Sequence, residues 1–294
     1  MSFTALVVIH DSARPLEALL RSIARHLDPT PQVVVVDSGS RDDGVAVARD
    51  HGARVVGLDG NPGFGAANNA GLAIVEHEVT VLLNPDCELL DGGLARLATL
   101  AAREDALLVP RLLETDRRVQ RSAHPLPGGA GALVPGVWPP RAMPRPMREH
   151  FEPWRAAAPR RVGWAIAACV AARTDLLRRL GPFDPTAFLF YEDLELCLRA
   201  RAAGVPTILR PEVRVVHHGG HATGPALGAG VLDLQARRRR TVVGAGLGRR
   251  ALVLDDAAQA LTFATRAAAR AALRRDAGRE RAQLRAVLHA RRDR

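Results

Sequence analysis

Lysine is absent from this chain of 294 residues, and cysteine occurs only three times, at Cys87, Cys169 and Cys197. The cysteines show no CxxC spacing, and so sparse and odd a set argues against a disulfide framework and for a reducing compartment. Long hydrophobic runs are also missing, because the longest, residues 162–172, is much shorter than the roughly 20 residues that cross a bilayer. The chain enters a strand-like run at once, without a basic leader, so we expect no signal peptide and a cytoplasmic location.

The positive charge of the chain is concentrated at its C-terminal end. The formal net charge is +10, but residues 236–294 contain 16 arginines and five acidic residues, which gives +11. The preceding 235 residues therefore carry a net charge of −1. This asymmetry predicts a nearly neutral body with a basic tail.

The basic tail allows two interpretations. Arg266, Arg270 and Arg274 recur at every fourth position and would share one face of a helix. They form either the solvated face of a helix packed on the body or a docking surface for anionic lipid, at about 1 kcal/mol per arginine near the membrane. Nucleic-acid binding is not expected, because the arginines lack interleaved aromatic residues and no reading motif is present.

The first part of the chain alternates between apolar runs and segments with helical spacing. Strands are expected at 6–9, 32–36, 54–57, 80–83 and 107–109, and helices at 15–26, 42–51, 65–75 and 92–102. Strands separated by helices of this length imply βαβ units with right-handed crossovers. The pattern predicts an α/β fold with a mostly parallel central sheet, whose ligands lie beyond the carboxyl ends of the strands.

The rest of the sequence changes character twice. Residues 117–160 are rich in proline, glycine and arginine, which predicts a long irregular loop or lid. A strand is expected at 162–172 and a short helix at 174–180. From about residue 225 the composition predicts helices rich in alanine and arginine. We therefore expect one domain at 1–224 and a helical extension at 225–294.

Several polar side chains stand where the expected elements end. Asp37 follows a β-branched strand, and Asp86 closes the motif Asn84-Pro85-Asp86 after another apolar strand. His217, the first of two adjacent histidines, ends a later strand-like run. Side chains at such ends converge on clefts, and both acid–base chemistry and metal binding need that convergence.

Two further segments have the composition of a site. Glu192 and Asp193 are adjacent acids at the start of an expected helix, directly after an aromatic strip. The turn at 61–71 is rich in glycine and asparagine, and the helix start at Gly65 offers backbone N–H groups to an anion. Each feature also has an ordinary explanation, as a capped turn, acids favoured by the helix dipole or a solvated strand end. Their common order on one α/β scaffold favours function.

That order resembles the inverting family 2 glycosyltransferases of the A-type fold, particularly their rhamnosyltransferase-like branch. The resemblance covers most of residues 4–221, and its motifs are specific in combination rather than singly. It rests on VVVVDSGSRDDG at 33–44, NPGFGAANNAGL at 61–72, LLNPDCEL at 82–89, GPFDPTAFLFYEDLELCLRARAAG at 181–204 and VVHHGG at 215–220. It implies the A-type glycosyltransferase fold, with the C-terminal helices as an extension.

The resemblance implies a site for a nucleotide-sugar donor and a divalent metal ion. The donor side would be formed by residues at strand ends and at one helix start, namely His10, Asp37, Gly65, Asn68, Asn84 and Asp86. Of these, Asp86 would hold Mg²⁺ or Mn²⁺ against the sugar diphosphate. His217 would be the second metal ligand.

The same resemblance implies a single displacement that inverts the configuration of the sugar. Asp193, with Glu192 as the alternative, would be the general base that takes a proton from the acceptor hydroxyl. The donor would be a dTDP- or UDP-linked sugar, rhamnose-like or a similar hexose. The acceptor would be a glycan or polyprenyl-linked molecule in cell-surface polysaccharide synthesis. A lipid-linked acceptor would bring the chain to the inner face of the plasma membrane, bound through residues 236–294.

Departures from the family pattern leave a different function open. The family often has Tyr-Asn after the first strand, where this chain has His10-Asp11, and Ala167-Ala168 stands where a glycine is common. The alternative is a catalytically silent scaffold of the same fold that binds a nucleotide or a partner enzyme, and the intact acid pair and metal motif argue against it. A nucleotidyltransferase would need a glycine-rich basic loop near the N-terminus, and the sequence has none.

Overall fold

The computed structural model describes residues 2–181, 183–184, 188–219 and 230–292. It divides into two compact units, of which the first comprises Met1–Ala123 with Trp154–Ala226 and the second His124–Pro153 with Leu227–Arg294. The domain boundary that the sequence predicts at 224–225 lies outside the described residues. Residues 124–153, which the sequence assigns to an irregular lid, belong to the second unit.

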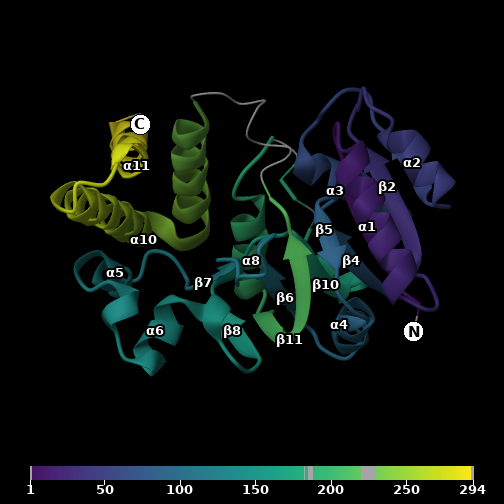
Figure 1. Cartoon of the computed structure of the whole chain (residues 1–294), viewed down its shortest axis with the longest axis horizontal. Helices are drawn as coiled ribbons and strands as arrows, with labels where there is room; N and C mark the ends of the chain where they lie inside the picture. Colours follow the sequence, from purple (N-terminus) through teal and green to yellow (C-terminus); the bar gives the residue numbers. More distant parts are fainter. Residues whose placement is uncertain (1, 182, 185–187, 220–229, 293–294) are drawn as a thin grey trace. The chain divides into compact units, whose positions relative to one another are not determined.

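A nine-stranded sheet is the framework of the first unit (Figure 1). Its strands follow the order β3-β2-β1-β4-β10-β6-β11-β5, and β8 pairs with β11. They span β1 Thr4–Ile9, β2 Gln32–Asp37, β3 Arg54–Gly57, β4 Val79–Leu83, β5 Cys87–Leu89, β6 Leu107–Leu113, β8 Arg160–Val162, β10 Cys169–Arg173 and β11 Thr207–His217. Two short strands, β7 (Ala123–His124) and β9 (Trp164–Ala165), lie outside this sheet.

Six of the nine strands of the sheet, namely β1–β4, β6 and β11, run in the same direction. β1 pairs in parallel with β2 and β4, β2 with β3, and β6 with β11. β10 is antiparallel to both β4 and β6, so the carboxyl ends of β1–β4, β6 and β11 lie along one edge, called the carboxyl edge below. The predicted mostly parallel sheet is confirmed. The single strand expected at 162–172 is instead divided among β8, β9 and β10, because an apolar run does not reveal where the chain turns.

The central strands are buried on both faces, which requires helices on both sides of the sheet. On one face, Ala5 and Val7 of β1 share a core cluster with Leu16 and Leu19, which recur with helical spacing in α1. Leu6, between them in β1, faces α3 on the other side. The helices of this unit are α1 Ala13–His26, α2 Gly44–Asp50, α3 Phe64–Ile74, α4 Gly93–Ala101, α7 Thr174–Arg179 and α8 Glu192–Ala202.

The close approach of α3 to the sheet depends on Gly71. A Cβ atom at this position would lie 2.3 Å from Leu6 Cδ1 and 2.9 Å from Val36 Cγ2. Both neighbours are fully buried, so neither side chain has room to move away. The missing side chain at Gly71 therefore sets the distance between α3 and strands β1 and β2.

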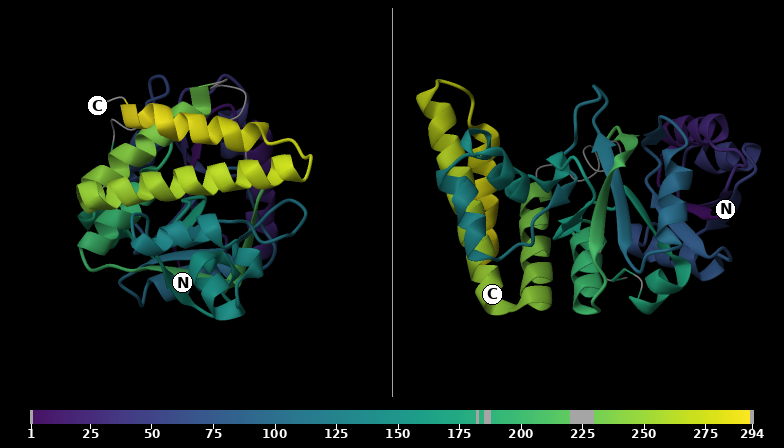
Figure 2. Two further views of the ribbon diagram at one scale, coloured as in Figure 1. Left: turned by 90° about the vertical axis from the view of Figure 1, so that its left-hand side faces the viewer. Right: turned by 90° about the horizontal axis from the view of Figure 1, so that it is seen from below.

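The second unit is helical (Figure 2). Its long helices are α10 (Val231–Ala272), which kinks at Gly248, and α11 (Gly278–Arg292). Residues 124–153 of this unit contain α5 (Val134–Val137), α6 (Arg145–Phe151) and short 3-10 turns at Ala130–Leu133 and Pro140–Ala142, and a further 3-10 turn, Pro153–Arg155, leads into the first unit. The predicted C-terminal helices are confirmed. Over the described residues, no helix combines the length and the apolar content that crossing a bilayer requires.

Two buried aspartates form ion pairs with some of the arginine side chains of the second unit. Asp255 accepts two hydrogen bonds of 2.7 Å from Arg239. Asp256 pairs with Arg240 and lies 3.9 Å from Arg291 of α11. Both carboxylates are almost completely buried, and a buried carboxylate needs such partners. The positive charge of these arginines therefore neutralises buried carboxylates within the second unit.

The prediction that Arg266, Arg270 and Arg274 share one helix face is wrong for Arg274. α10 ends at Ala272, and Arg274 lies beyond it with a φ of 52°. Arg270 donates to Asp276 O at 2.5 Å and lies 3.5 Å from Glu280 of α11. The chain is already turning into α11 here, so the spacing of the arginines continues past the end of the helix.

Replacing Gly71 with alanine is expected to destabilise the protein. Overpacking a tight core costs about 1–3 kcal/mol, which exceeds the gain of about 1 kcal/mol that alanine brings to a helix interior. Denaturant unfolding followed by circular dichroism measures the difference. Gly57→Ala is the control, because a Cβ atom there meets nothing within 4 Å. Equal stability of Gly71→Ala and the wild type would contradict the tight packing of α3.

Candidate functional site

The carboxyl edge brings His10 and Asp37 next to each other. The parallel register of β1 and β2 sets Ile9 opposite Asp37, so His10 follows at the same edge. His10 Nδ1 lies 2.8 Å from Ser38 O, and Asp37 Oδ1 accepts a hydrogen bond of 3.0 Å from the backbone N–H of Ser40. These bonds fix both side chains at the carboxyl edge, where an α/β sheet binds its ligands.

Asp11 orders the loop that follows β2. It has a left-handed φ of 49°, and its backbone N–H donates to Ser40 Oγ at 3.0 Å. The backbone N–H of Arg41 donates to Asp11 Oδ1 at 2.7 Å and holds the pKa of Asp11 below its usual value. The departure from the family pattern at this position therefore has a structural use in this chain.

The start of α3 packs against the segment that leads to the acid pair. A Cβ atom at Gly65 would lie 2.8 Å from Phe183 Cβ, and Asn69 Nδ2 donates to Phe183 O at 2.8 Å. Asn68 is buried and donates to Phe64 O at 2.9 Å within its own helix. Gly65 and Asn68 thus serve packing and helix geometry here, and their role in donor binding stays a prediction.

Two consecutive aromatic residues lead into α8 with unusual backbone conformations. Phe190 and Tyr191 have φ values of 72° and 61°, in the left-handed region that bulky side chains rarely adopt. The Tyr191 ring lies 6.2 Å from the ring of Trp164. Such conformations persist where the surrounding structure holds them, and they gather at functional sites.

The acid pair Glu192 and Asp193 forms the first turn of α8. Just before it, Phe188 O accepts a hydrogen bond of 3.3 Å from the N–H of Phe64, at the start of α3. Because α3 begins beyond the carboxyl end of β3, this bond holds the approach to α8 at the carboxyl edge. Both acids are half-buried. Asp193 Oδ1 accepts a hydrogen bond of 2.7 Å from the N–H of Leu194.

Asp86 and His217 face each other at the same edge. β5 pairs with the end of β11 in a register that sets Cys87 opposite His217, and Asp86 directly precedes Cys87. Asp86 Oδ1 lies 3.3 Å from His217 Nε2, and each side chain is only 12% exposed. The backbone N–H of His218 donates to Asp86 O at 2.9 Å and continues the pairing of the two strands beyond Cys87 and His217.

Gln120 fixes the orientation of the His217 ring, a role that no sequence motif indicates. Gln120 Oε1 lies 3.0 Å from His217 Nδ1, while its Nε2 donates to Glu114 Oε2 at 3.2 Å and to His217 O at 3.4 Å. The two acceptors orient the amide, so His217 Nδ1–H is the donor to Oε1. His217 Nε2 faces Asp86 and lies 3.4 Å from Asn84 Nδ2.

The three cysteines offer no nucleophile or metal ligand to this site. All are free and buried. Burial raises the pKa of Cys87, which directly follows Asp86, and it raises the pKa of Cys169 as well. Burial also raises the pKa of Cys197 to about 11. The thiols are therefore neutral at physiological pH, and a neutral thiol is a poor nucleophile and a poor ligand.

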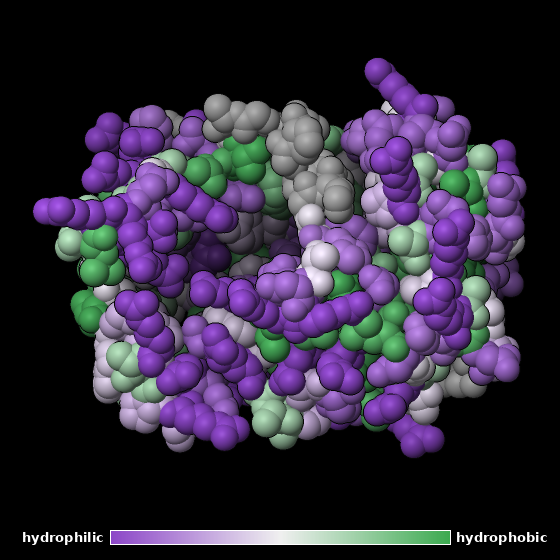
Figure 3. Space-filling model, in the orientation of Figure 1, coloured by the Kyte–Doolittle hydropathy of each residue, from purple (hydrophilic) through white to green (hydrophobic). Residues whose placement is uncertain are grey.

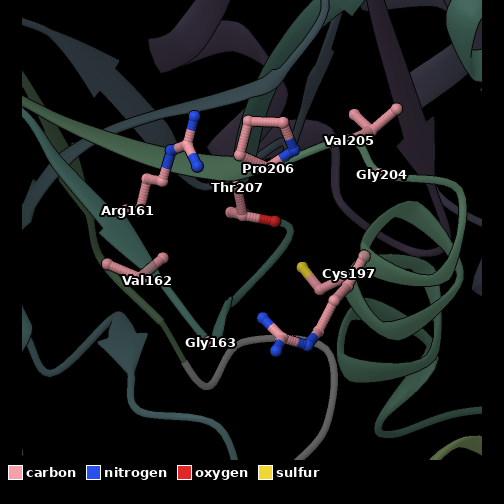
Figure 4. Close-up of a pocket in the computed structure, with 9 residues that line it drawn as sticks. Arg161, Val162, Gly163, Cys197, Gly204, Val205, Pro206 and Thr207 are labelled. Atoms are coloured by element: carbon pink, nitrogen blue, oxygen red, sulfur yellow. The ribbon is translucent and has the colours of Figure 1, made fainter.

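A pocket lies at the opposite end of β11 from His217 (Figure 4). Thr207, the first residue of β11, lines it, while His217 is the last residue of the same strand. At about 3.3 Å per residue, the two ends of this strand are roughly 30 Å apart. Arg161, Val162 and Cys197 contribute to its wall, and none of the predicted site residues does.

A mostly parallel sheet that carries an acid pair and a facing aspartate–histidine pair at its carboxyl edge has the architecture of an A-type glycosyltransferase. The family model described as glycosyl transferase family 2 matches residues 4–158, more than half of the chain. The chain therefore belongs to glycosyl transferase family 2 and is a glycosyltransferase. The family that the sequence motifs indicate is confirmed.

The chain is also similar to individual members of this class. It is 28% identical over 239 residues to N-acetylglucosaminyl-diphospho-decaprenol L-rhamnosyltransferase of Mycobacterium tuberculosis, covering 74% of this chain and 76% of the relative. The structure of GalNAc-T7 with UDP, GalNAc and Mn²⁺ has a TM-score of 0.61 at 15% identity. That match covers 82% of this chain but only 48% of GalNAc-T7, so this chain spans about half of its length.

A mannosyltransferase from Pyrobaculum calidifontis, in complex with GDP-Man and Mn²⁺, has a TM-score of 0.57 at 18% identity. The match covers 92% of this chain and 75% of the mannosyltransferase. At such low identities the two structures support the fold alone, and they confirm the predicted A-type architecture.

Proposed function

We propose that the chain is a metal-dependent, inverting transferase that moves a rhamnose-like or similar hexose from a nucleoside-diphosphate sugar to a hydroxyl group. The observation that carries the proposal is the buried contact of 3.3 Å between Asp86 and His217 at the carboxyl edge. The Mn²⁺-containing structures of related fold support it, as does the similarity to the mycobacterial rhamnosyltransferase.

The residues at this contact suit a divalent ion that is shared with a diphosphate. Asn84 Oδ1 is buried beside the pair and has no hydrogen-bond partner among the described residues. Over the same residues, no group of three or more His, Cys, Asp or Glu side chains could hold a metal by itself. Asp86 and His217 would supply two ligands to Mn²⁺ or Mg²⁺, and phosphate oxygens would complete the shell. The ion would offset the charge that develops on the leaving diphosphate.

The acid pair would supply the base for the transfer. Asp193, with Glu192 as the alternative, takes the proton from the acceptor hydroxyl as its oxygen attacks the anomeric carbon. The bond from that carbon to the diphosphate oxygen breaks on the opposite side, which inverts the configuration. His10 and Asp37 would orient the nucleotide at the other end of the donor, with Gly65 and Asn68 shaping the wall between. A dTDP- or UDP-linked donor is favoured.

The acceptor would be a glycan or a polyprenyl-linked molecule of cell-surface polysaccharide synthesis. The decaprenol-linked acceptor in the name of the mycobacterial relative supports this. Such an acceptor would hold the enzyme at the inner face of the plasma membrane. The arginines of residues 236–294 would then attract the anionic lipid headgroups, apart from those already bound to Asp255 and Asp256.

Asp193→Asn is expected to lower kcat by about 10²–10⁴-fold, because general-base catalysis contributes about that much. The donor would still bind, since the base acts on the acceptor. Transfer from dTDP- and UDP-sugars to a soluble polyprenyl-diphosphate analogue, together with donor titration, measures both. Glu192→Gln is the matched variant, and a loss in Glu192→Gln alone would assign the base to Glu192.

Metal binding is expected to require the nucleotide. Mn²⁺ alone should raise the melting temperature little, because only two protein ligands are present. Mn²⁺ with UDP or dTDP at about 100 times the dissociation constant should add roughly 2.7 kcal/mol, a shift of a few degrees. Thermal unfolding with UDP, dTDP, GDP and CMP, each with and without Mn²⁺, tests this. A full shift with Mn²⁺ alone would mean a metal site that does not depend on phosphate oxygens.

Gln120→Ala is expected to weaken Mn²⁺ binding about 10–100-fold, because the hydrogen bond that orients His217 is lost. The half-maximal Mn²⁺ concentration for transfer should rise, while kcat at saturating Mn²⁺ recovers. Thr115→Ala is the control, since Thr115 Oγ1 lies 3.1 Å from Nδ1 of the neighbouring His218, which is not a proposed ligand. An unrecovered kcat would instead indicate general damage to the fold.

A further inference from the structure

The second unit combines the positive charge of the chain with most of its exposed hydrophobic side chains. Counted over the sequence it contains 19 arginines and eight acidic residues, a net charge of +11, against −1 in the first unit. Of the eight large hydrophobic side chains that are exposed among the described residues, six belong to the second unit. Cationic and apolar groups on one surface are typical of elements that bind the interface of a membrane.

Three of these six side chains come from the short segment 134–148, which runs from the start of α5 into the first turn of α6. Val137 is 71% exposed, Trp138 42% and Met147 40%. Val137 is the last residue of α5, and the backbone N–H of Trp138 donates to Val134 O at 2.8 Å. In Figure 3, hydrophobic side chains reach the surface at the edge of the molecule where Figure 1 draws α5. The segment therefore presents an aliphatic side chain and a tryptophan together.

The same segment is anchored from behind. Met143 is only 2% exposed. A Cβ atom at Gly136 would lie 2.8 Å from Leu261 Cγ of α10, so α5 packs closely on that helix. α10 in turn packs along α11 (Figure 2). Val137 and Trp138 are thus displayed from a fixed support.

The backbone of this segment can leave water at low cost. Its prolines have no N–H group, and they stand at Pro135, Pro139, Pro140, Pro144 and Pro146. Several remaining N–H groups are bonded within the segment, with Ala142 donating to Pro139 O and Met143 to Pro140 O at 2.9 and 3.0 Å. Unpaired N–H groups are what makes irregular backbone expensive in an apolar medium.

The charges of the segment suit an anionic surface. Residues 134–148 contain Arg141, Arg145 and Arg148 and no acidic residue. Arg148 donates to the carbonyl oxygens of Arg141 and Met143 and so stiffens the turn. The Arg145 side chain is 78% exposed, although it also bonds Glu149 of the next turn. Arginine beside tryptophan is the pairing found where a protein meets lipid headgroups and the ends of acyl chains.

We propose that residues 134–148 are a membrane wedge, in which Val137 and Trp138 enter the interface of an anionic bilayer while Arg141 and Arg145 bind its headgroups. The wedge extends the membrane association proposed above for residues 236–294. The wedge lies outside the tail and adds an apolar contact, which salt does not screen. It rests on the exposure of these side chains and not on the transfer reaction.

In the first test, the fluorescence of Trp138 itself reports membrane binding. The other two tryptophans, Trp154 and Trp164, are 7% and 8% exposed and should respond little. The full chain is titrated with vesicles of phosphatidylcholine and phosphatidylglycerol at a ratio of 7:3, and with pure phosphatidylcholine. A blue shift of tryptophan emission with the anionic vesicles, with quenching by brominated acyl chains, is expected. The absence of both would overturn the proposal.

Substitutions locate the contact. Val137→Ser and Trp138→Ser are each expected to lower cosedimentation with anionic vesicles about tenfold, as the loss of a buried apolar side chain would. Trp138→Phe should retain most of the binding. Val253→Ser is the control, because Val253 is 55% exposed on α10 of the same unit. Equal losses in the wedge and control variants, or none in the wedge variants, would contradict the wedge.

Two arms separate the wedge from the proposed chemistry. Raising salt from 50 to 200 mM should weaken binding of the wild type but leave the ratio between wild type and Trp138→Ser unchanged, because the apolar term is not screened. Transfer to a soluble acceptor should be unaffected in Trp138→Ser. A chain that transfers no sugar yet shows the Trp138 shift would refute the proposed activity alone. Self-association through this surface without vesicle binding would refute the wedge alone.

Discussion

Burial of the central strands on both faces is the constraint on which the rest of this molecule depends. Every residue of β1 and β4 is buried, so helices must cover the sheet from both sides. Crossover helices make neighbouring strands parallel, and parallel strands end at one edge. The histidine after β1, the aspartate that ends β2 and the Asn-Pro-Asp turn after β4 meet there for that reason alone. Gly71 allows α3 to come close enough for this arrangement to pack.

The antiparallel strands determine what the edge can do. β5 doubles back from the Asn-Pro-Asp turn and pairs with the last residues of β11, which brings His217 to Asp86. A slip of one residue would put Val216 beside Asp86 and turn His217 to the other face of the sheet. The metal pair that we propose is therefore a consequence of strand register. The hairpin after β6 adds Gln120 beside His217, so three segments that are distant in sequence build the proposed metal site.

Periodicity sufficed to predict much of this architecture, because buried parallel strands and amphipathic helices have regular patterns. The place of Asp37, Asp86 and His217 at the carboxyl edge could be predicted, because each stands at the end of a regular element and matches a family motif. Gln120 could not, because it lies in a segment rich in proline, glycine and arginine and meets His217 across 97 residues of sequence. The antiparallel pairing of β10 could not be predicted either, because an apolar run in the sequence does not indicate in which direction the strand runs in the sheet. Arg274 shows the converse error, where a helical spacing continues after the helix has ended.

A count of arginines overstates the attraction of the tail to a membrane. Arg239 and Arg240 are committed to buried carboxylates, so part of the +11 charge stabilises the second unit instead of meeting lipid. Electrostatic attraction also weakens with salt and distance, with a Debye length of about 8 Å at physiological ionic strength. An exposed tryptophan and valine on a proline-rich turn supply a contact that depends on neither. A folded unit that has both kinds of contact can hold an enzyme at a surface where charge alone would let it exchange.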